Sequence, residues 1–217
     1  MKDARLQAIS DFLTPLDRFI DIGTDHAYIP IYMAKLGSKK ILATDIHQNA
    51  LAIAKQNIFK ENLTNVIDTL LSDGLEKVDP RSYDTLVIAG MGTATIKHIL
   101  SDPEKLQSIR KIIVQTNNHL SQLRIFMNQI GYRLVGEKIV KERKHYYVVM
   151  CYEKGKQVLS KSQYALGLYD VHNKEYYEYL YQKYTSLLSK VPAYKKECVK
   201  EMLAYLTEYL EKKDRIV

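Results

Sequence analysis

The segment Asp21-Ile22-Gly23-Thr24-Asp25-His26 brings two carboxylates, a hydroxyl, an imidazole and a glycine together within six residues. It follows Phe19 and Ile20, which are typical of a strand buried on both faces. We interpret the segment as the end of a strand, a glycine turn and the start of a helix. Carboxylates at such a turn would repel a diphosphate at the helix N-terminus, so they favour a ligand that carries positive charge there.

Three further strand ends carry polar residues or glycine. Asp45 ends the second predicted strand, Asp73-Gly74 follows the third, and Ala89-Gly90-Met91-Gly92 ends the fourth. Because such ends meet at one edge of a parallel sheet, we expect them to line one site for a nucleotide-like ligand. Asp45 would accept hydrogen bonds from ribose hydroxyls. Asp73 would either reach the adenine amine or form an Asx turn with Gly74.

S-adenosylmethionine fits this pattern better than NAD does. The NAD fingerprint needs glycine at the first, third and sixth positions of the turn, where this chain has Gly23, Asp25 and Tyr28. S-adenosylmethionine carries an ammonium and a sulfonium instead of phosphates, so a carboxylate at Asp21 or Asp25 would stabilise it. The predicted cofactor-binding residues are Asp21, Gly23, Thr24, Asp45, Ile46, Asp73, Gly74, Ala89, Gly90 and Met91.

Apolar strands alternate with amphipathic helices along the part of the chain that must position these residues. Strands are predicted at 19–23, 40–45, 66–71, 84–89 and 111–115, and helices at 5–13, 27–36, after residue 45 and at 120–130. Residues 132–139 and 146–152 predict an antiparallel hairpin, joined by Lys141-Glu142-Arg143-Lys144. This order predicts a doubly wound α/β sheet.

The composition changes near residue 153. Thirteen of the 17 tyrosines lie from Tyr146 onward. Apolar residues then recur every three or four positions, at Tyr177, Leu180, Tyr184, Leu187 and Val191 and again at Val199, Met202, Leu206 and Tyr209. Pro192 interrupts the pattern and suits the first turn of a second helix. We therefore predict a cofactor-binding domain at 1–153 and an α-helical hairpin, a coiled coil, at 160–217.

Composition and charge narrow the class of protein. The net charge of +7 is compatible with a nucleic-acid partner without requiring one. The two cysteines, Cys151 and Cys198, have no zinc-site spacing, so we expect reduced thiols, no metal and a cytoplasmic location. The N-terminus is unlike a secretory signal, and the uncharged runs are too short to span a bilayer. We expect no membrane partner, and we favour a monomer.

Three motifs resemble those of one known family. The segment 21–30, DIGTDHAYIP, is similar to the D-I-G-[ST]-D-H-A-Y-[LI]-P signature of bacterial tRNA adenine-N1 methyltransferases that modify adenine 22. Ala89-Gly90-Met91-Gly92 resembles the family's A-G-M-G-G, and Gln115-Thr116-Asn117 its Q-P-N. Thr93 and Thr116 depart from the pattern. The resemblance covers nearly the whole chain and implies a class I methyltransferase (Rossmann-like) fold, S-adenosylmethionine as methyl donor and tRNA as substrate.

The chemistry implied by this resemblance suggests roles for further residues. The acceptor atom, N1, lies on the Watson–Crick edge of adenine, so we expect the nucleotide to be flipped out of its helix. The candidate catalytic residues are Asp25, His26, Gln115 and Asn117, and the candidate substrate-binding residues are Tyr28, Lys141, Arg143 and Lys144. As alternatives, Tyr28 could pack the first helix, and each basic residue could simply lie on a solvated surface. Two other functions also remain open. The protein could methylate another RNA or a protein, or it could be a non-catalytic RNA-binding protein that retains the cofactor fold.

Overall fold

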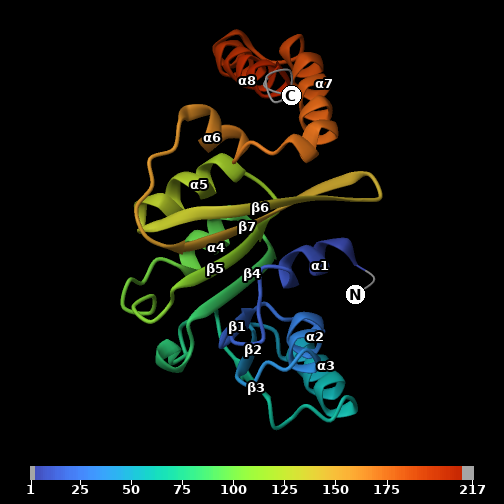
Figure 1. The fold of residues 1–217 in the computed structure, drawn as a ribbon, viewed down its shortest axis with the longest axis vertical. Helices are drawn as coiled ribbons and strands as arrows, with labels where there is room; N and C mark the ends of the chain where they lie inside the picture. Colours follow the sequence, from blue (N-terminus) through green and yellow to red (C-terminus); the bar gives the residue numbers. More distant parts are fainter. Residues whose placement is uncertain (1–2, 212–217) are drawn as a thin grey trace. The chain divides into compact units, whose positions relative to one another are not determined.

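A computed structural model of the chain describes residues 3–211, which fold into a seven-stranded mixed sheet with flanking helices (Figure 1). The strands are β1 (Phe19–Ile22), β2 (Ile41–Asp45), β3 (Ile67–Leu71), β4 (Thr85–Met91), β5 (Lys111–Thr116), β6 (Tyr132–Glu142) and β7 (His145–Lys154). The α-helices are α1 (Ala4–Ser10), α2 (Tyr28–Lys35), α3 (Gln48–Lys60), α4 (Thr93–Ile99), α5 (Leu120–Gln129), α6 (Lys161–Leu166), α7 (Lys174–Leu188) and α8 (Ala193–Glu211). No helix among the described residues is both long enough and apolar enough to cross a membrane.

The strand order is β3-β2-β1-β4-β5-β7-β6. The first five strands in this order are parallel to one another, while β7 pairs antiparallel with both β5 and β6. The chain starts in the middle of the sheet and winds outward in both directions, so the predicted doubly wound, Rossmann-like fold is confirmed. The predicted hairpin is also present, with β7 inside the sheet and β6 at its edge.

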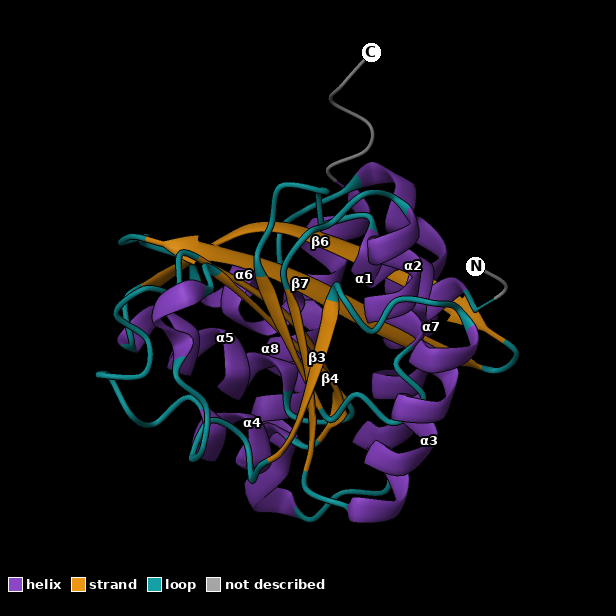
Figure 2. Cartoon of the chain, turned by 90° about the horizontal axis from the view of Figure 1, so that it is seen from below, coloured by secondary structure: helices purple, strands orange, loops and turns teal. Residues whose placement is uncertain are grey.

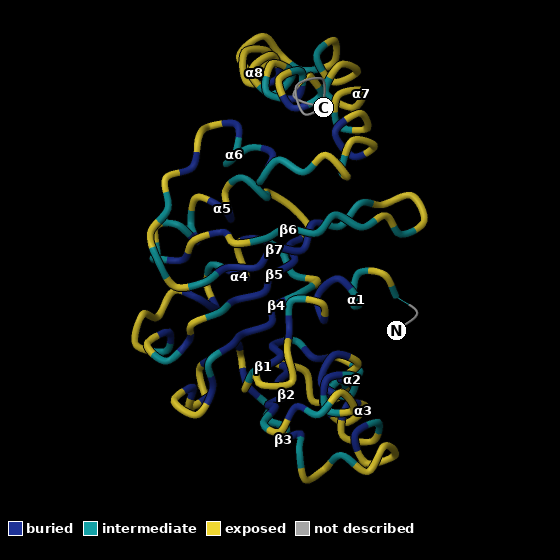
Figure 3. Tube along the Cα trace, in the orientation of Figure 1, coloured by how far each residue is buried: buried dark blue, intermediate teal, exposed yellow. Residues whose placement is uncertain are grey.

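Burial explains why the central segments form strands. All residues of β1 and β2 are buried, and Figure 3 shows the same for most of β4 and β5. Alternate residues face opposite sides of the sheet. Phe19, Ile41 and Val87 belong to one core cluster with Ile9 of α1 and Met33 of α2. Asp21 lies two residues after Phe19 in β1, so the two side chains are on the same face of the sheet. Figure 2 shows α1, α2 and α3 on one side of the sheet and α4 on the other.

The described residues divide into two compact units. Residues 3–119 and 126–157 form the first, and residues 120–125 and 158–211 form the second. Within the second unit, the Arg124 side chain is 1% exposed and donates hydrogen bonds to the carbonyls of Tyr164 and Ala165, at 3.3 and 3.1 Å. The second unit therefore holds the first turns of α5 as well as the C-terminal helices.

Tyrosine rings form the core of the second unit. Tyr177 and Tyr209 meet edge to face with ring centroids 5.3 Å apart, and Tyr209 donates a 2.6 Å hydrogen bond to the carbonyl of Gly167. The helical hairpin predicted from the spacing is confirmed as α7 and α8. Two details of that prediction were wrong: Leu187 is 37% exposed, and Pro192 lies just before α8 rather than in its first turn. Residues 212–217 of the predicted hairpin lie outside the described residues.

Candidate active site

A cavity of about 310 Å³ lies at the carboxyl ends of β1 and β4, within the first unit. It is lined by many of the residues predicted from the sequence: Asp21, Gly23, Thr24, Asp25, His26, Tyr28, Ala89 and Gly90. The size is at the lower end of the range for small-ligand sites. Distant segments of the chain meet here because β1 and β4 are neighbours in the sheet.

Asp21 is the buried acid of this cavity. It is 5% exposed, and the Thr24 hydroxyl donates a 2.7 Å hydrogen bond to its Oδ2. Burial raises the pKa of Asp21 from 3.8 to about 6, against the lowering effect of the Thr24 hydrogen bond, and the nearby Asp45 carboxylate raises it further. A cationic ligand group would compensate the desolvated carboxylate that this environment disfavours.

Asp45, the last residue of β2, forms hydrogen bonds with the segments that follow β1, β2 and β3. Its Oδ2 accepts a hydrogen bond from the backbone N–H of Asp25 at 3.2 Å, its Oδ1 accepts one from His47 at 2.9 Å, and its carbonyl accepts one from Ser72. Asp45 is 6% exposed and is not among the residues that line the cavity, although each of its carboxylate oxygens keeps a second lone pair. The adjacent Ile46 is 53% exposed.

Glycines give the cavity its open backbone. Gly90 adopts φ +76° at a bulge between β4 and β5, a conformation that favours glycine. Gly23 also has φ +76°, and a Cβ there would lie 2.3 Å from Cε of Met91, so no other residue fits without displacing Met91. Met91 therefore packs against the β1 turn, while Gly90 leaves its backbone at the cavity wall.

The side chains of Gln115 and Asn117 hold Gly90 in place. Gly90 N–H donates to Gln115 Oε1 at 3.0 Å, Gln115 Nε2 donates to Asn117 Oδ1 at 3.1 Å, and Asn117 Nδ2 donates to the Gly90 carbonyl at 2.8 Å. A backbone N–H only donates and a carbonyl only accepts, so this ring fixes the orientation of both amides. Gln115 is fully buried, whereas Asn117 is exposed and keeps further hydrogen-bonding capacity.

The two departures from the family pattern contact each other. Thr93 and Thr116 are buried, and their hydroxyl oxygens lie 3.0 Å apart. The Thr116 hydroxyl is also 3.2 Å from the Met91 carbonyl, and the Thr93 hydroxyl donates to the carbonyl of Asn118 at 2.6 Å. The Asn118 Oδ1 accepts a hydrogen bond from Thr93 N–H at 3.0 Å. The loops that follow β4 and β5 are thus locked together beside Gly90.

Asp25, His26 and Tyr28 form an exposed rim. The His26 and Tyr28 rings stack at 5.2 Å with 16° between their planes, and Tyr28 is 54% exposed. His26 Nε2 lies 3.6 Å from Asp25 Oδ2. Asp25 and Ala27 have φ values of +50° and +58°, uncommon for residues other than glycine, so the backbone enters α2 through a tight turn. The rim presents an aromatic surface next to a carboxylate.

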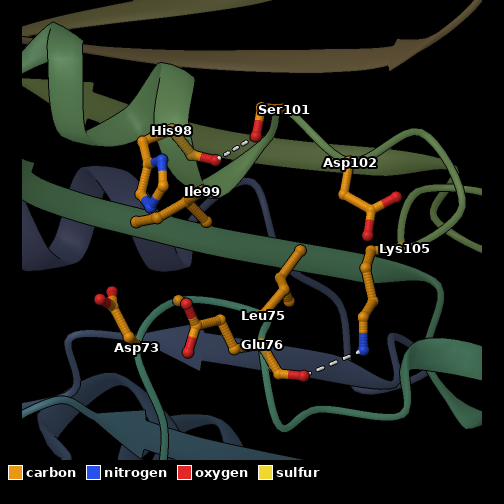
Figure 4. A pocket seen from close by; sticks show the side chains of 9 residues that line it. Asp73, Leu75, Glu76, His98, Ile99, Ser101, Asp102 and Lys105 are labelled. Atoms are coloured by element: carbon orange, nitrogen blue, oxygen red, sulfur yellow. Dashed lines mark hydrogen bonds between the residues drawn. The ribbon is translucent and has the colours of Figure 1, made fainter.

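Asp73 and Gly74 line a second, smaller cavity of about 110 Å³ (Figure 4). Gly74 has φ +50°, and a Cβ there would lie 2.8 Å from the Ile99 side chain. Across this cavity, Lys105 reaches the carbonyls of Glu76 and Val78. Asp73 and Gly74, which were predicted to bind the cofactor near its adenine, therefore do not line the cavity that contains Asp21. They follow Ser72, whose backbone N–H donates a hydrogen bond to the carbonyl of Asp45.

The basic residues Lys141, Arg143 and Lys144 are exposed at the tip of the β6–β7 hairpin. Glu142 pairs with His145, so Arg143 and Lys144 form a two-residue turn, with Arg143 at φ +55°. The Lys141 ammonium lies 5.3 Å from the centre of the Tyr146 ring. The turn thus presents cationic groups to solvent.

Sequence reasoning missed two features of this site, Arg5 of α1 and the Thr93–Thr116 pair. Arg5 lines the cavity beside Asp21, and the signal for it was its spacing of four from the buried Ile9. The contact between the two threonines had no signal in the sequence. Among residues 3–211, no three His, Cys, Asp or Glu side chains cluster in a way that could hold a metal ion.

Known proteins resemble this chain along most of its length. It is 34% identical over 154 residues to the tRNA (adenine(22)-N(1))-methyltransferase of Bacillus subtilis, a match that spans 70% of this chain and 64% of that enzyme. The structure of M. capricolum TrmK in complex with S-adenosyl-homocysteine superposes with a TM-score of 0.85 at 28% identity, covering 97% of this chain and 98% of that one. The B. subtilis M1A22 tRNA methyltransferase TrmK superposes at 0.84 with 25% identity, covering 97% and 99%.

A family comparison identifies the domain that carries the cavity. Residues 2–150 match the family described as Methyltransferase domain, and they include every strand end that contributes to the site. The match extends over more than half of the chain. The protein therefore belongs to the methyltransferase-domain family.

Proposed function

We propose that this protein transfers a methyl group from S-adenosylmethionine to N1 of adenine 22 in tRNA. The observation that carries the proposal is the cavity at the ends of β1 and β4, with a buried acid and an open glycine backbone. It lies in a chain that aligns over 97% of its length with TrmK structures. Because the proposed substrate is tRNA, we place the enzyme in the cytoplasm.

The residues present fit this cofactor. The buried Asp21 suits an ammonium, Asp45 retains lone pairs for ribose hydroxyls, and Gly23 has a φ of +76° that favours glycine. The remaining cofactor-binding residues of the proposal are Thr24, Ile46, Asp73, Gly74, Ala89, Gly90 and Met91. When bound, S-adenosylmethionine supplies an electrophilic methyl group on a sulfonium.

The proposed roles of the rim residues follow from the acceptor. N1 of neutral adenine carries an in-plane lone pair, so its methylation requires no proton removal and no general base. The adenine becomes cationic as the N1–carbon bond forms, and the exposed Asp25 carboxylate stabilises that charge. His26 and Tyr28 offer a stacking surface for the flipped base.

Gln115 and Asn117 act in this proposal mainly by positioning. Their ring of hydrogen bonds holds the Gly90 backbone at the cavity wall, and Asn117 retains one amide hydrogen for the base edge. Correct placement of reactants accounts for a large part of the acceleration available without a covalent step.

Contact with tRNA is assigned to Lys141, Arg143 and Lys144 and to the helical hairpin, so that residues 1–153 bind the cofactor and 160–217 add RNA contacts. The first set is exposed at the β6–β7 turn, and the α7–α8 hairpin carries the exposed Lys183, Lys190, Lys195 and Lys196. Phosphate contacts of this kind position a substrate without reading its sequence.

Methyl transfer from labelled S-adenosylmethionine to an unmodified tRNA transcript tests the proposal, with the modified nucleotide mapped by primer-extension arrest. The expected result is arrest at adenine 22 and no labelling of a matched transcript with guanosine at that position. Cofactor binding without labelled tRNA would instead favour another RNA or a protein as acceptor. Absence of cofactor binding would favour the non-catalytic alternative.

A further inference from the structure

The turn that carries the rim residues has an unfavourable backbone conformation. Asp25 and Ala27 have φ values of +50° and +58°, a region in which a Cβ crowds the neighbouring carbonyl oxygen. Ala27 is also the N-cap of α2, and its methyl group offers no capping hydrogen bond. A backbone of this kind persists only where surrounding groups hold it. The turn therefore depends on contacts from other elements.

Two side chains from neighbouring elements hold the turn. Asp45 Oδ2 accepts the N–H of Asp25 at 3.2 Å, and Nδ2 of Asn57, on α3, donates to the carbonyl of His26 at 3.1 Å. A carbonyl only accepts, so Asn57 must present its NH₂ group. Together the two hydrogen bonds fix the peptide group before Asp25 and the peptide group after His26.

The contact from Asn57 acts directly on the strained residue. The His26 carbonyl belongs to the peptide group that joins His26 to Ala27, so rotation of this group changes the φ of Ala27. Such a rotation would relax Ala27 and move the His26 ring from Tyr28, on which it stacks at 5.2 Å. Asn57 is half-buried and does not line the cavity, so any effect on the reaction must pass through the turn.

We propose that Asn57 is a positioning residue for methyl transfer, whose hydrogen bond to the His26 carbonyl keeps the rim in the arrangement that receives the target base. The inference rests on the proposed function, which gives the rim its charge-stabilising and stacking roles. Asp45 holds the same turn but is also assigned to the cofactor. Substitution of Asn57 therefore separates the placement of the rim from cofactor binding.

Two matched amide-to-carboxylate variants test the inference. Asn57→Asp keeps the shape but replaces the donor with an oxygen that faces the His26 carbonyl. Gln56→Glu makes the same change of charge at the adjacent, exposed position of α3. With both substrates saturating, we expect the single-turnover rate to fall about 10-fold in Asn57→Asp and to stay within about twofold of the wild type in Gln56→Glu. Affinity for S-adenosylmethionine in calorimetry should stay within about twofold in both variants, which also shows that they fold.

Proton resonances of the His26 ring give a second readout, which does not depend on activity. The ring stacks on Tyr28, so its protons are shifted by the ring current of the tyrosine. We expect Asn57→Asp to move these resonances toward their positions in Tyr28→Leu, which lacks the stacking ring, and Gln56→Glu to leave them in place.

An unchanged rate or unchanged His26 resonances in Asn57→Asp would overturn the inference. A loss of S-adenosylmethionine affinity as large as the loss of rate would overturn it in favour of a general role in the fold. A wild-type protein that binds S-adenosylmethionine without methylating tRNA would overturn the proposed function and the catalytic part of the inference. The His26 resonances would then still decide whether Asn57 holds the turn, so the two failures are distinguishable.

Discussion

Replacing Asp21 with asparagine should stabilise the protein while weakening cofactor binding. The pKa of Asp21 rises from 3.8 to about 6 because the carboxyl is buried, so the folded state at neutral pH holds a carboxylate that its environment disfavours. Asparagine has nearly the same shape, and its Oδ1 can still accept the hydrogen bond of the Thr24 hydroxyl. The substitution removes the desolvated charge and keeps the packing.

The magnitude and its pH dependence follow from the pKa. Between pH 3.8 and about 6 the folded state binds more protons than the unfolded state, so the free energy of unfolding of the wild type falls as the pH rises. The difference in pKa corresponds to about 3 kcal/mol, present in full above about pH 6. The asparagine side chain does not titrate, so the advantage of Asp21→Asn should be about 3 kcal/mol at about pH 7.5 and shrink toward about pH 4.

Urea unfolding followed by circular dichroism at several pH values measures this difference in the free energy of unfolding. Calorimetry measures the affinity for the cofactor. We expect the loss of a charge-assisted contact in Asp21→Asn to weaken the binding of S-adenosylmethionine by about 10- to 100-fold at neutral pH. Wild-type affinity should also fall as the pH drops through about 6, since Asp21 then becomes neutral. A variant no more stable than the wild type at neutral pH, or an advantage that does not change with pH, would refute the reasoning.

Three further variants test other parts of the site. Asp45→Ala should abolish cofactor binding in calorimetry, and unchanged affinity would contradict the ribose assignment. Thr116→Val should lower the free energy of unfolding by about 1–3 kcal/mol, because the hydroxyl pair with Thr93 is buried; thermal unfolding with no change would show that the pair is dispensable. Reversing both charges at residues 143–144 should weaken tRNA binding and reduce its salt dependence, with Lys55→Glu on α3 as the control; an unchanged salt dependence would remove the hairpin from the RNA interface.

Much of the fold could be predicted because local signals and burial agree. The runs 19–22 and 41–45 are mostly apolar, each carries a carboxylate at or near its end, and both are buried throughout. Helix α4 was not predicted, because Ile96 and Ile99 are its only large apolar residues and two positions do not establish a period. The seam of the hairpin was wrong at Leu187, which lies near the end of α7 and is 37% exposed.

The site was harder to predict because a residue type does not reveal its partners. Gln115 and Asn117 were expected to hold the base, and their amides hold Gly90. That ring depends on the bulge between β4 and β5, where Ala89 pairs with Gln115, Met91 pairs with Thr116 and Gly90 is the extra residue. Arg5 likewise looked like one charge on an amphipathic helix, and only the tertiary fold shows that its Nε is buried without a partner among the described residues.

Thr93 and Thr116 show how two departures from a family pattern can be one structural feature. Taken separately, a threonine in place of glycine and a threonine in place of proline each suggest a local change of backbone. In the fold their hydroxyls meet at 3.0 Å, and Thr116 also contacts the carbonyl of Met91, next to the Gly90 that Gln115 and Asn117 hold. Each threonine gives the buried hydroxyl of the other a hydrogen-bond partner, so the pair lowers the cost of burying both hydroxyls. Changing both positions together should therefore cost less stability than the sum of the single changes.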